Sequence, residues 1–511
     1  MPEYLKFHST PSGNHEGKQH IIIVGAGIIG VCTAYYLVNH PKYDPQKFHI
    51  TLIESKRVAG GASGKAGGLL ALWAFPEQIV SLSFDLHQKL SNEYNGEKEW
   101  GYRRLTTVSL EGDISHLTNK KKSKNGAING DKNGNLQRGQ EYTDDDDEDE
   151  DEDEEEDEDD DNDTDEYNEF DDGSFKQAVT HDSDSSSSLT DKPPKKAARN
   201  TRSSSTIQLE SLSNRRLPPN LNWITSSLIE HCSTLGGTDT TAQVHPYKFT
   251  NFILRKAVEQ SQGSLELILG KVDQITYSEE SGSATGVQYR PTSVKEDKKQ
   301  GEIIDLEASQ IVLTVGPWTS KILPDCPISG LRAHSITIAP FKDQPVSPYA
   351  IFTEFKTGPY TYISPEIYAR QDEVYVCGEG DSTVAVPETT DDVEVVKSKC
   401  DELFRQVGKV SPNLRKGQIL KRQACYLPVL DVPSSSGPLI GETNVANLYL
   451  ASGHSCWGIN NAPGTGKIMS ELLLEGEVTS ADISSLDPSL YFDASVLFED
   501  EDDEEEEDGD E

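Results

Sequence analysis

The sequence predicts an α/β fold in which a domain with parallel strands is joined to a domain built on an antiparallel sheet. Residues 21–24 are a run of apolar residues, typical of a buried strand, and a glycine-rich turn and a helical pattern follow up to His40. A second strand over 49–55 completes a βαβ start whose parallel strands are buried on both faces. Residues 331–380 alternate apolar and polar side chains and contain many Thr, Tyr and Val, which predicts an antiparallel sheet.

Other segments supply the rest of both domains. Amphipathic spacing predicts a helix over 247–260, and strands are expected at 102–110, 265–269, 310–315 and 447–454. The last strand is followed by Gly-rich residues and then by a helix that starts at Gly464. Alternation of helical and strand patterns is typical of an α/β architecture.

The net charge of −40 is concentrated in two segments. Residues 141–172 contain 25 acidic side chains and residues 499–511 contain 12, with no Lys or Arg in either. The rest of the chain has 50 acidic against 47 basic residues and is close to neutral. This distribution argues against broad nucleic-acid binding by the folded part.

Residues 112–206 have few apolar side chains and are expected to be a disordered acidic and Ser-rich insert in a surface loop. The acidic run 144–160 has two interpretations, a solvated spacer or a docking segment for a basic protein partner, and the nearby serines are candidate phosphorylation sites. Lys192–Arg202 is either a nuclear-import signal or a basic patch that neutralises the acids.

The remaining composition indicates a cytoplasmic protein. The N-terminus has no apolar core typical of a signal peptide, and no apolar run approaches the ~18 residues that a membrane span needs. Seven scattered cysteines do not form a secreted disulfide framework, and without a CxxC pair no metal site is expected.

The order of these segments predicts a domain scheme. We expect an N-terminal tail at 1–18, a first nucleotide-binding part at 19–111, the insert at 112–206, a continuation with part of the substrate domain at 207–325, the substrate domain at 326–437, a C-terminal nucleotide-binding part at 438–490 and an acidic tail at 491–511.

A GxGxxG pattern carries the strongest functional signal. Gly25, Gly27 and Gly30 follow the first strand directly and begin the helix, where they permit a tight turn, backbone approach to a pyrophosphate and close helix–strand packing. Glu54 ends the second strand, where its carboxylate can accept hydrogen bonds from ribose hydroxyls and disfavours NADP. The pattern predicts dinucleotide binding; a Gly-rich turn without a ligand and an NAD-dependent dehydrogenase are the alternatives.

A second Gly/Ser-rich loop at 59–70, AGGASGKAGGLL, favours FAD, because it can place more backbone N–H groups along a long dinucleotide. This loop resembles the corresponding loop of the FAD-dependent oxidoreductase family of D-amino-acid oxidase, glycine oxidase and sarcosine oxidase. Residues 241–257, 270–275, 311–323 and 438–473 resemble further segments of that family in the same order. The chain looks like a fungal-like intracellular member with an acidic insert.

The resemblance implies a Rossmann-like FAD-binding domain of the glutathione-reductase-like βαβ type with an antiparallel-sheet substrate domain, and a set of residues for FAD. These expected residues are Gly25, Ala26, Gly27, Ile28, Ile29, Gly30, Glu54, Ser55, Ser63, Gly64, Ala66, Gly67, Gly68, Val272, Gly316, Trp318, Gly453, His454, Trp457, Gly458 and Ile459.

The sequence departs from the family at the substrate. Many family members carry an arginine that binds the substrate carboxylate, and here that position is Leu427. Arg332, Arg370 and Arg422 are possible replacements. His454, Tyr426 and Arg422 are the candidate catalytic residues, and tyrosines at 360, 362 and 375 are further sources of a phenol.

Cys425 lies near the position at which the sarcosine-oxidase branch attaches flavin covalently. It is either such an attachment point or a buried structural thiol, and we expect non-covalent FAD. The expected reaction is hydride transfer to flavin from a CH–NH bond of a small amine or modified amino acid. The alternative is a flavin-binding interaction protein that acts through its acidic segments.

Overall fold

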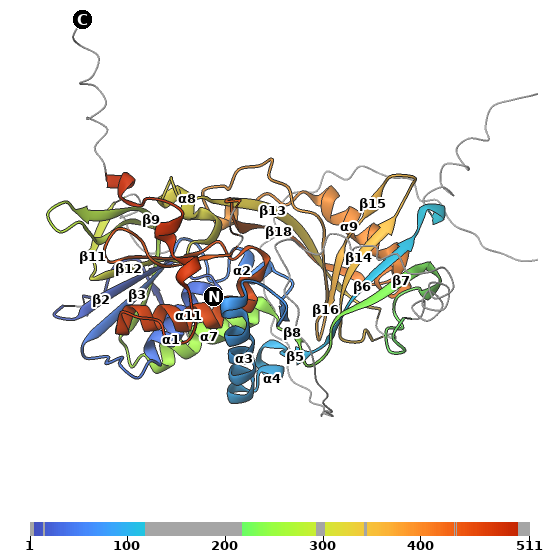
Figure 1. Cartoon of the computed structure of the whole chain (residues 1–511), viewed down its shortest axis with the longest axis horizontal. Helices are drawn as coiled ribbons and strands as arrows, with labels where there is room; N and C mark the ends of the chain where they lie inside the picture. Colours follow the sequence, from blue (N-terminus) through green and yellow to red (C-terminus); the bar gives the residue numbers. More distant parts are fainter. Residues whose placement is uncertain are drawn as a thin grey trace, which may run out of the picture. The chain divides into compact units, whose positions relative to one another are not determined.

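The computed structural model describes residues 5–13, 16–117, 217–292, 302–341, 345–433, 435 and 437–498. The acidic runs, Lys192–Arg202 and most of the predicted insert lie outside the described residues. Two large sheets organise the described part (Figure 1).

The first sheet has the parallel core that the βαβ pattern predicts. Its strand order is β11–β10–β9–β3–β2–β12–β20–β19, and β1 pairs with β9. The strands are β1 Phe7–His8, β2 Gln19–Val24, β3 Phe48–Glu54, β9 Leu265–Ser278, β10 Ser283–Pro291, β11 Ile304–Glu307, β12 Gln310–Leu313, β19 Leu439–Glu442 and β20 Leu448–Ser452. Strands β2, β3, β9, β12 and β20 run parallel, and their side chains are mostly buried on both faces, as expected for a sheet covered on both sides.

Helices cover one face of this sheet (Figure 1). They are α1 Ile28–Val38, α3 Glu77–Tyr94, α7 Pro246–Gln260 and α11 Gly458–Glu475. The prediction that the last helix starts at Gly464 is wrong, because it begins at Gly458 with Pro463 inside it. Its Gly466 explains the close packing on α1, since a Cβ there would lie 2.5 Å from the carbonyl carbon of Cys32.

The second sheet carries the order β18–β13–β17–β16–β14–β6–β7, with β15 on β14. The strands are β6 Thr106–Asp113, β7 Ile229–Gly236, β13 Ile328–Ala339, β14 Tyr349–Lys356, β15 Tyr362–Ile363, β16 Glu366–Ala369, β17 Val374–Cys377 and β18 Gln418–Leu430. The sheet is mixed rather than purely antiparallel, because β14 and β6 pair in parallel. Strands β6 and β7 belong to this sheet, although the sequence scheme gave most of β6 to the nucleotide-binding part and left β7 in a range shared by both domains. Pairing of β6 with β14 and of β7 with β6 decides their place, and no local pattern encodes it.

Helix α9 (Lys397–Val410) packs on one face of the second sheet, where it buries Ile336, Ile367 and Val376. Smaller elements complete the described part. They are α2 Ala62–Lys65, α4 Gly96–Trp100, α8 Thr319–Ile322, α10 Pro412–Arg415, β4 Leu69–Ala71, β5 Arg103–Arg104, β8 Thr241–Gln243 and the 3₁₀ turns η1 Ser226–Leu228, η2 Gly316–Trp318, η3 Thr390–Asp392, η4 Ser455–Trp457, η5 Ser484–Leu486, η6 Pro488–Leu490 and η7 Ser495–Phe498.

Three predicted boundaries are corrected by packed residues. Residues 5–13 are not a loose tail, because β1 pairs with β9 and the Ser12 N–H donates to Glu266 at 3.0 Å. The insert does not start at residue 112, because Ile114 is buried and its N–H donates to the Lys356 carbonyl at 2.8 Å. The ring of Phe498 stacks on Tyr277 with a centroid distance of 4.1 Å, so the C-terminal tail does not begin at 491. In each case a few apolar residues order a mainly polar segment.

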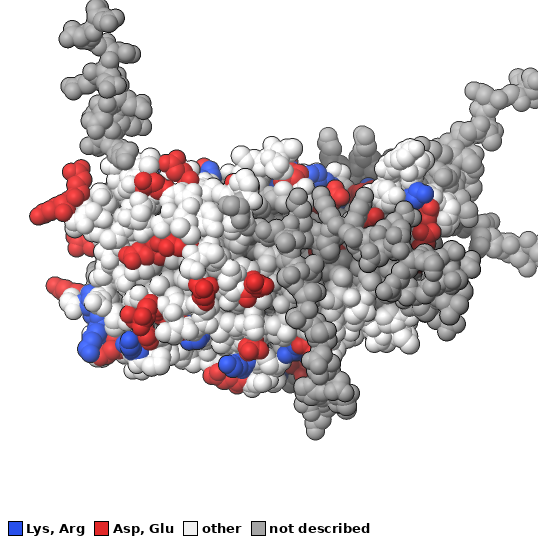
Figure 2. Space-filling view, in the orientation of Figure 1, with Lys and Arg blue, Asp and Glu red and all other residues white. Residues whose placement is uncertain are grey.

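The described surface mixes both signs of charge. Figure 2 shows acidic and basic side chains scattered among uncharged ones on the face in view. Within the described residues, no helix combines the length and the apolar character that a membrane crossing requires.

Candidate cofactor site

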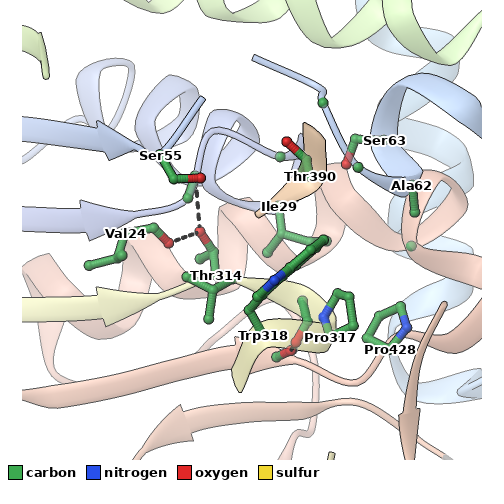
Figure 3. A pocket seen from close by; sticks show the side chains of 18 of the residues that line it. Val24, Ile29, Ser55, Ala62, Ser63, Thr314, Pro317, Trp318, Thr390 and Pro428 are labelled. Atoms are coloured by element: carbon green, nitrogen blue, oxygen red, sulfur yellow. Dashed lines mark hydrogen bonds between the residues drawn. The ribbon is translucent and has the colours of Figure 1, made fainter. Parts of the chain in front are cut away.

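A cavity of about 470 Å³ lies at the carboxyl ends of β2, β3 and β12. The glycine turn after β2, the loop at residues 60–66 and the segment 314–318 after β12 line it, and residues of the second-sheet domain complete its wall. In α/β sheets the crevice at the carboxyl ends of the strands is the usual place for a dinucleotide. Figure 3 shows side chains from these segments around the cavity.

The three glycines of the turn have different roles. Gly25 has a φ of +103°, and a Cβ at Gly30 would lie 2.1 Å from the Gly25 carbonyl oxygen and 2.5 Å from Thr314 Oγ1. These two glycines therefore permit the turn and the close packing of helix on strand. A Cβ at Gly27 would meet only Ser63 Oγ, at 3.2 Å, so Gly27 leaves open space in front of the helix.

The N-terminus of α1 points its backbone N–H groups toward this cavity. The Ile28 N–H donates to Ser63 Oγ at 2.9 Å, and the following first-turn N–H groups have no partner within the helix. The positive end of the helix dipole adds to this field. Donors of this kind fit the pyrophosphate of a dinucleotide.

Glu54 is fixed at the end of β3 by backbone donors. Its Oε2 accepts from the Ala26 N–H and its Oε1 from the Lys56 N–H, both at 2.9 Å. Burial raises the pKa of the Glu54 carboxyl, while these backbone hydrogen bonds act in the opposite direction. The side chain lines the cavity, where it can accept hydrogen bonds from ribose hydroxyls.

The other end of the cavity is apolar. Trp318 donates its indole N–H to the Pro387 carbonyl at 2.7 Å, which fixes the ring. Figure 3 shows this ring between Ile29 and Pro317. Leu427 lines the same region, so a flat ring system could pack against apolar side chains here.

A segment of the second-sheet domain closes over the cavity. Glu388 forms ion pairs with Lys271 at 2.5 Å and with Lys321 at 2.6 Å, and the two lysines lower the pKa of its carboxyl to about 2. A second ion pair joins Asp391 of the same segment to Arg57 of the first domain at 3.2 Å. The sequence analysis did not identify these residues, because nothing local indicates that residues 388 and 391 reach the first domain.

The predicted cofactor residues divide into two groups. Those that line the cavity are Gly25, Gly27, Ile28, Ile29, Glu54, Ser55, Ser63, Ala66, Val272, Gly316, Trp318, His454, Gly458 and Ile459. Those that do not line it are Ala26, Gly30, Gly64, Gly67, Gly68, Gly453 and Trp457.

The glycines of the second loop serve packing. A Cβ at Gly64 would lie 2.2 Å from the Ala59 carbonyl oxygen, and one at Gly67 would lie 2.3 Å from the ring of Tyr368. Gly68 has a φ of +87°, which a side chain rarely adopts. The loop is rich in glycine because it packs closely against neighbouring segments, where side chains at these positions would clash.

None of the three arginines proposed as carboxylate clamps lines the cavity. Arg370 is buried and donates to the Ala66 and Gly67 carbonyls, so it holds the second loop in place. Arg332 pairs with Glu394 at 2.8 Å and with Asp381 at 3.5 Å.

Arg422 and Tyr426 were predicted as catalytic candidates, and neither side chain lines the cavity. Arg422 faces α9 and pairs with Asp401 at 2.7 Å, while the Tyr426 hydroxyl donates to the Ala385 carbonyl at 3.0 Å. Alternation along β18 explains this result, because both residues lie on the face opposite Leu427. The strand face could not be read from the sequence alone.

His454 lies at the cavity wall in neutral form. Burial lowers its pKa to about 3, and its Nε2 is 3.0 Å from Thr465 Oγ1. Cys425 is buried and does not line the cavity, and burial raises the pKa of its thiol to about 11. Because a thiolate is the nucleophilic form, this environment suits a structural thiol.

Comparison with known proteins identifies the family and the fold. The model of the FAD-dependent oxidoreductase (DAO) family matches residues 20–135 and 196–472. "Putative oxidoreductase TDA3" of Saccharomyces cerevisiae is 51% identical over 96% of this chain and 98% of its own length. Iminodiacetate oxidase from Chelativorans sp. BNC1 and glycine oxidase from Geobacillus kaustophilus share the fold, each with a TM-score of 0.56 over 92% of this chain and 98% of theirs, at 15% and 14% identity. The chain therefore belongs to the family of FAD-dependent oxidoreductases.

Proposed function

We propose that the protein binds FAD non-covalently in this cavity and oxidises a CH–NH bond of a small amine or modified amino acid. The observation that carries the proposal is a single cavity that joins the Glu54 end, suited to a ribose, to the apolar end at Trp318 and Leu427. The names of two structural neighbours, iminodiacetate oxidase and glycine oxidase, point to the same class of donor.

The residues present fit the cofactor. Glu54 would hold the adenosine ribose, and the open backbone at Gly27 with the N-terminus of α1 would hold the pyrophosphate. Bound FAD would supply the acceptor for a hydride from the carbon next to the amine nitrogen. Trp318 and Leu427 would exclude water from the reacting end and orient the substrate.

Positioning is the main requirement of this reaction. The imidazole of His454 stays uncharged throughout the physiological pH range, because burial lowers its pKa. Its Nε2 lies next to Thr465, and the ring would form a neutral, hydrogen-bonded part of the cavity lining. Hydride transfer gains chiefly from orientation in a dry site and does not depend on a general acid–base pair.

The proposal is tested with the purified FAD complex and a broad panel of amines and amino acids. Loss of the visible flavin absorption under anaerobic conditions, with hydrogen peroxide formed in air, is the expected result for at least one compound. A yellow protein that no compound reduces would instead support a role as a flavin-binding interaction protein.

A further inference from the structure

A half-buried carboxylate lies on the inner face of the second sheet, outside the residues that line the cofactor cavity but beside Cys456, which does line it. Glu366 and Tyr368 of β16 stand opposite Cys377 and Tyr375 of β17 in the antiparallel register. The Tyr368 hydroxyl donates to Glu366 Oε2, and the Cys377 thiol lies 3.8 Å from the same oxygen. Both contacts involve Oε2, so Oε1 remains available to a ligand. Burial raises the pKa of the Glu366 carboxyl.

This face is turned toward the first domain. A Cβ at Gly67 of the second loop would touch the Tyr368 ring, and the Gln423 amide of β18 donates to the Lys65 carbonyl at 2.9 Å. The opposite face of the same strands is covered by α9. Glu366 therefore lies between the two sheets and not on the outer surface.

Aromatic rings form a continuous group beside this carboxylate. Trp73 and Trp457 meet edge to face at 5.4 Å between ring centroids, and Trp73 lies 6.2 Å from Phe352. Phe352 in turn lies 6.0 Å from Tyr368, which donates to Glu366. Aromatic faces attract cations, most strongly where water is excluded.

The thiol of Cys456 connects this group with the cofactor cavity. Cys456 directly precedes Trp457 in the chain. Its side chain lines the cofactor cavity and is solvent-accessible there. Burial and then the charge of Glu366 raise the pKa of this thiol to about 12. Glu366 thus acts electrostatically on the end of the cavity where the reaction would occur.

No guanidinium among the described residues balances this carboxylate at the cavity. Leu427 occupies the clamp position, and Arg332 and Arg370 are held by other partners. Lys65 donates to the Ala424 carbonyl at 3.0 Å. A substrate carboxylate placed here would be repelled by Glu366, whereas a substrate ammonium would be attracted.

We infer that the substrate is a cationic amine without a carboxylate next to the reacting nitrogen, and that Glu366 and the rings of Trp73, Phe352, Tyr368 and Trp457 form its binding site. This inference rests on the proposed function and makes Glu366 its specificity-determining residue. For the redox step, the bound ammonium would first lose one N–H proton to solvent, and the hydride of the adjacent C–H bond would then pass to FAD. Water would hydrolyse the resulting iminium to a carbonyl compound and a free amine.

Binding is tested with two unreactive probes of similar shape, tetramethylammonium and pivalate. Titrations of the FAD complex follow tryptophan fluorescence and the visible flavin spectrum. Wild type is expected to bind tetramethylammonium and not pivalate, and Glu366→Gln to weaken tetramethylammonium roughly tenfold or more. Glu230→Gln, at an exposed carboxylate on β7 of the same sheet, is the matched control and should bind as wild type does. Equal binding of the cation by wild type and Glu366→Gln, or preference of wild type for pivalate, overturns the inference.

Reduction is tested with pairs that differ only in the carboxylate, pyrrolidine with proline and N-methylethylamine with N-methyl-alanine. The amine of each pair is expected to reduce the flavin faster than the amino acid. Reduction by the amino acids alone would overturn the inference and leave the proposed function standing. If neither these compounds nor any member of the broad panel reduces the flavin, the proposed function fails, and the binding titrations still decide whether Glu366 selects cations.

Discussion

Two glycines of the same turn offer a test that separates folding from cofactor binding. Gly30→Ala places a Cβ 2.1 Å from the Gly25 carbonyl oxygen and 2.5 Å from Thr314 Oγ1, so helix and strand must move apart. Overpacking of this kind costs about 1–3 kcal/mol. The higher helix propensity of alanine offsets up to about 1 kcal/mol of this cost. We therefore expect a net decrease in the free energy of unfolding of the apoprotein.

Gly27→Ala has a different expected effect. The backbone at residue 27 is extended, with φ −71° and ψ 175°, and accepts alanine without strain. The new Cβ meets only Ser63 Oγ, at 3.2 Å, so the apoprotein should unfold as wild type does. The methyl group would occupy the space through which the pyrophosphate reaches the α1 N-terminus. Loss of one charge-assisted hydrogen bond weakens binding by about 1.5–3 kcal/mol, or roughly 10- to 150-fold.

Urea unfolding of the apoproteins and FAD titrations followed by flavin fluorescence measure the two effects separately. The expected outcome is stability loss in Gly30→Ala and affinity loss at unchanged stability in Gly27→Ala. If Gly27→Ala binds FAD as tightly as wild type, the pyrophosphate does not lie at this turn and our interpretation of the cavity is wrong.

Three further predictions concern charge and thiol chemistry. Because burial lowers the pKa of His454 to about 3, the unfolded chain binds a proton below about pH 6.5 that the folded chain does not, so stability falls with decreasing pH. Relative to wild type, His454→Asn should remove about 1.7 kcal/mol of the stability that is lost between about pH 6.5 and 5 in urea unfolding, and an unchanged slope would contradict this assignment. Glu388→Gln removes the ion pairs with Lys271 and Lys321 that close the cavity, so FAD should dissociate roughly two- to five-fold faster in stopped-flow exchange; an unchanged rate would show that these pairs do not retain the cofactor. Acid precipitation should leave flavin in the supernatant, since the Cys425 thiol is buried away from the cavity; flavin in the pellet would reveal a covalent link.

The parallel core of the fold was predictable because its signals are local. The apolar run before Gly25 and the acid at Glu54 each belong to one strand end, and backbone geometry places strand ends together. The ribose and turn residues of the candidate site follow from that geometry. The strand expected at 265–269 and the family-like segment at 270–275 belong to one long strand, β9.

Contacts between the two sheets were not predictable in the same way. Arg422 and Leu427 differ by an odd number of positions on β18, so only one of them can face the cavity, and the choice depends on where α9 packs. Glu366 carries no sequence signal, because its significance comes from Tyr368, Cys377 and the rings that gather around it in three dimensions. Packing between distant segments decides such positions.

Oxidation of an amine by the FAD complex can be measured by an anaerobic titration of that complex with a cationic amine such as pyrrolidine. We predict one FAD per chain, loss of the visible absorption of oxidised flavin on addition of the amine and its recovery on admission of air. A complex that contains FAD and keeps its oxidised spectrum with amines and amino acids alike would contradict amine oxidation by this protein.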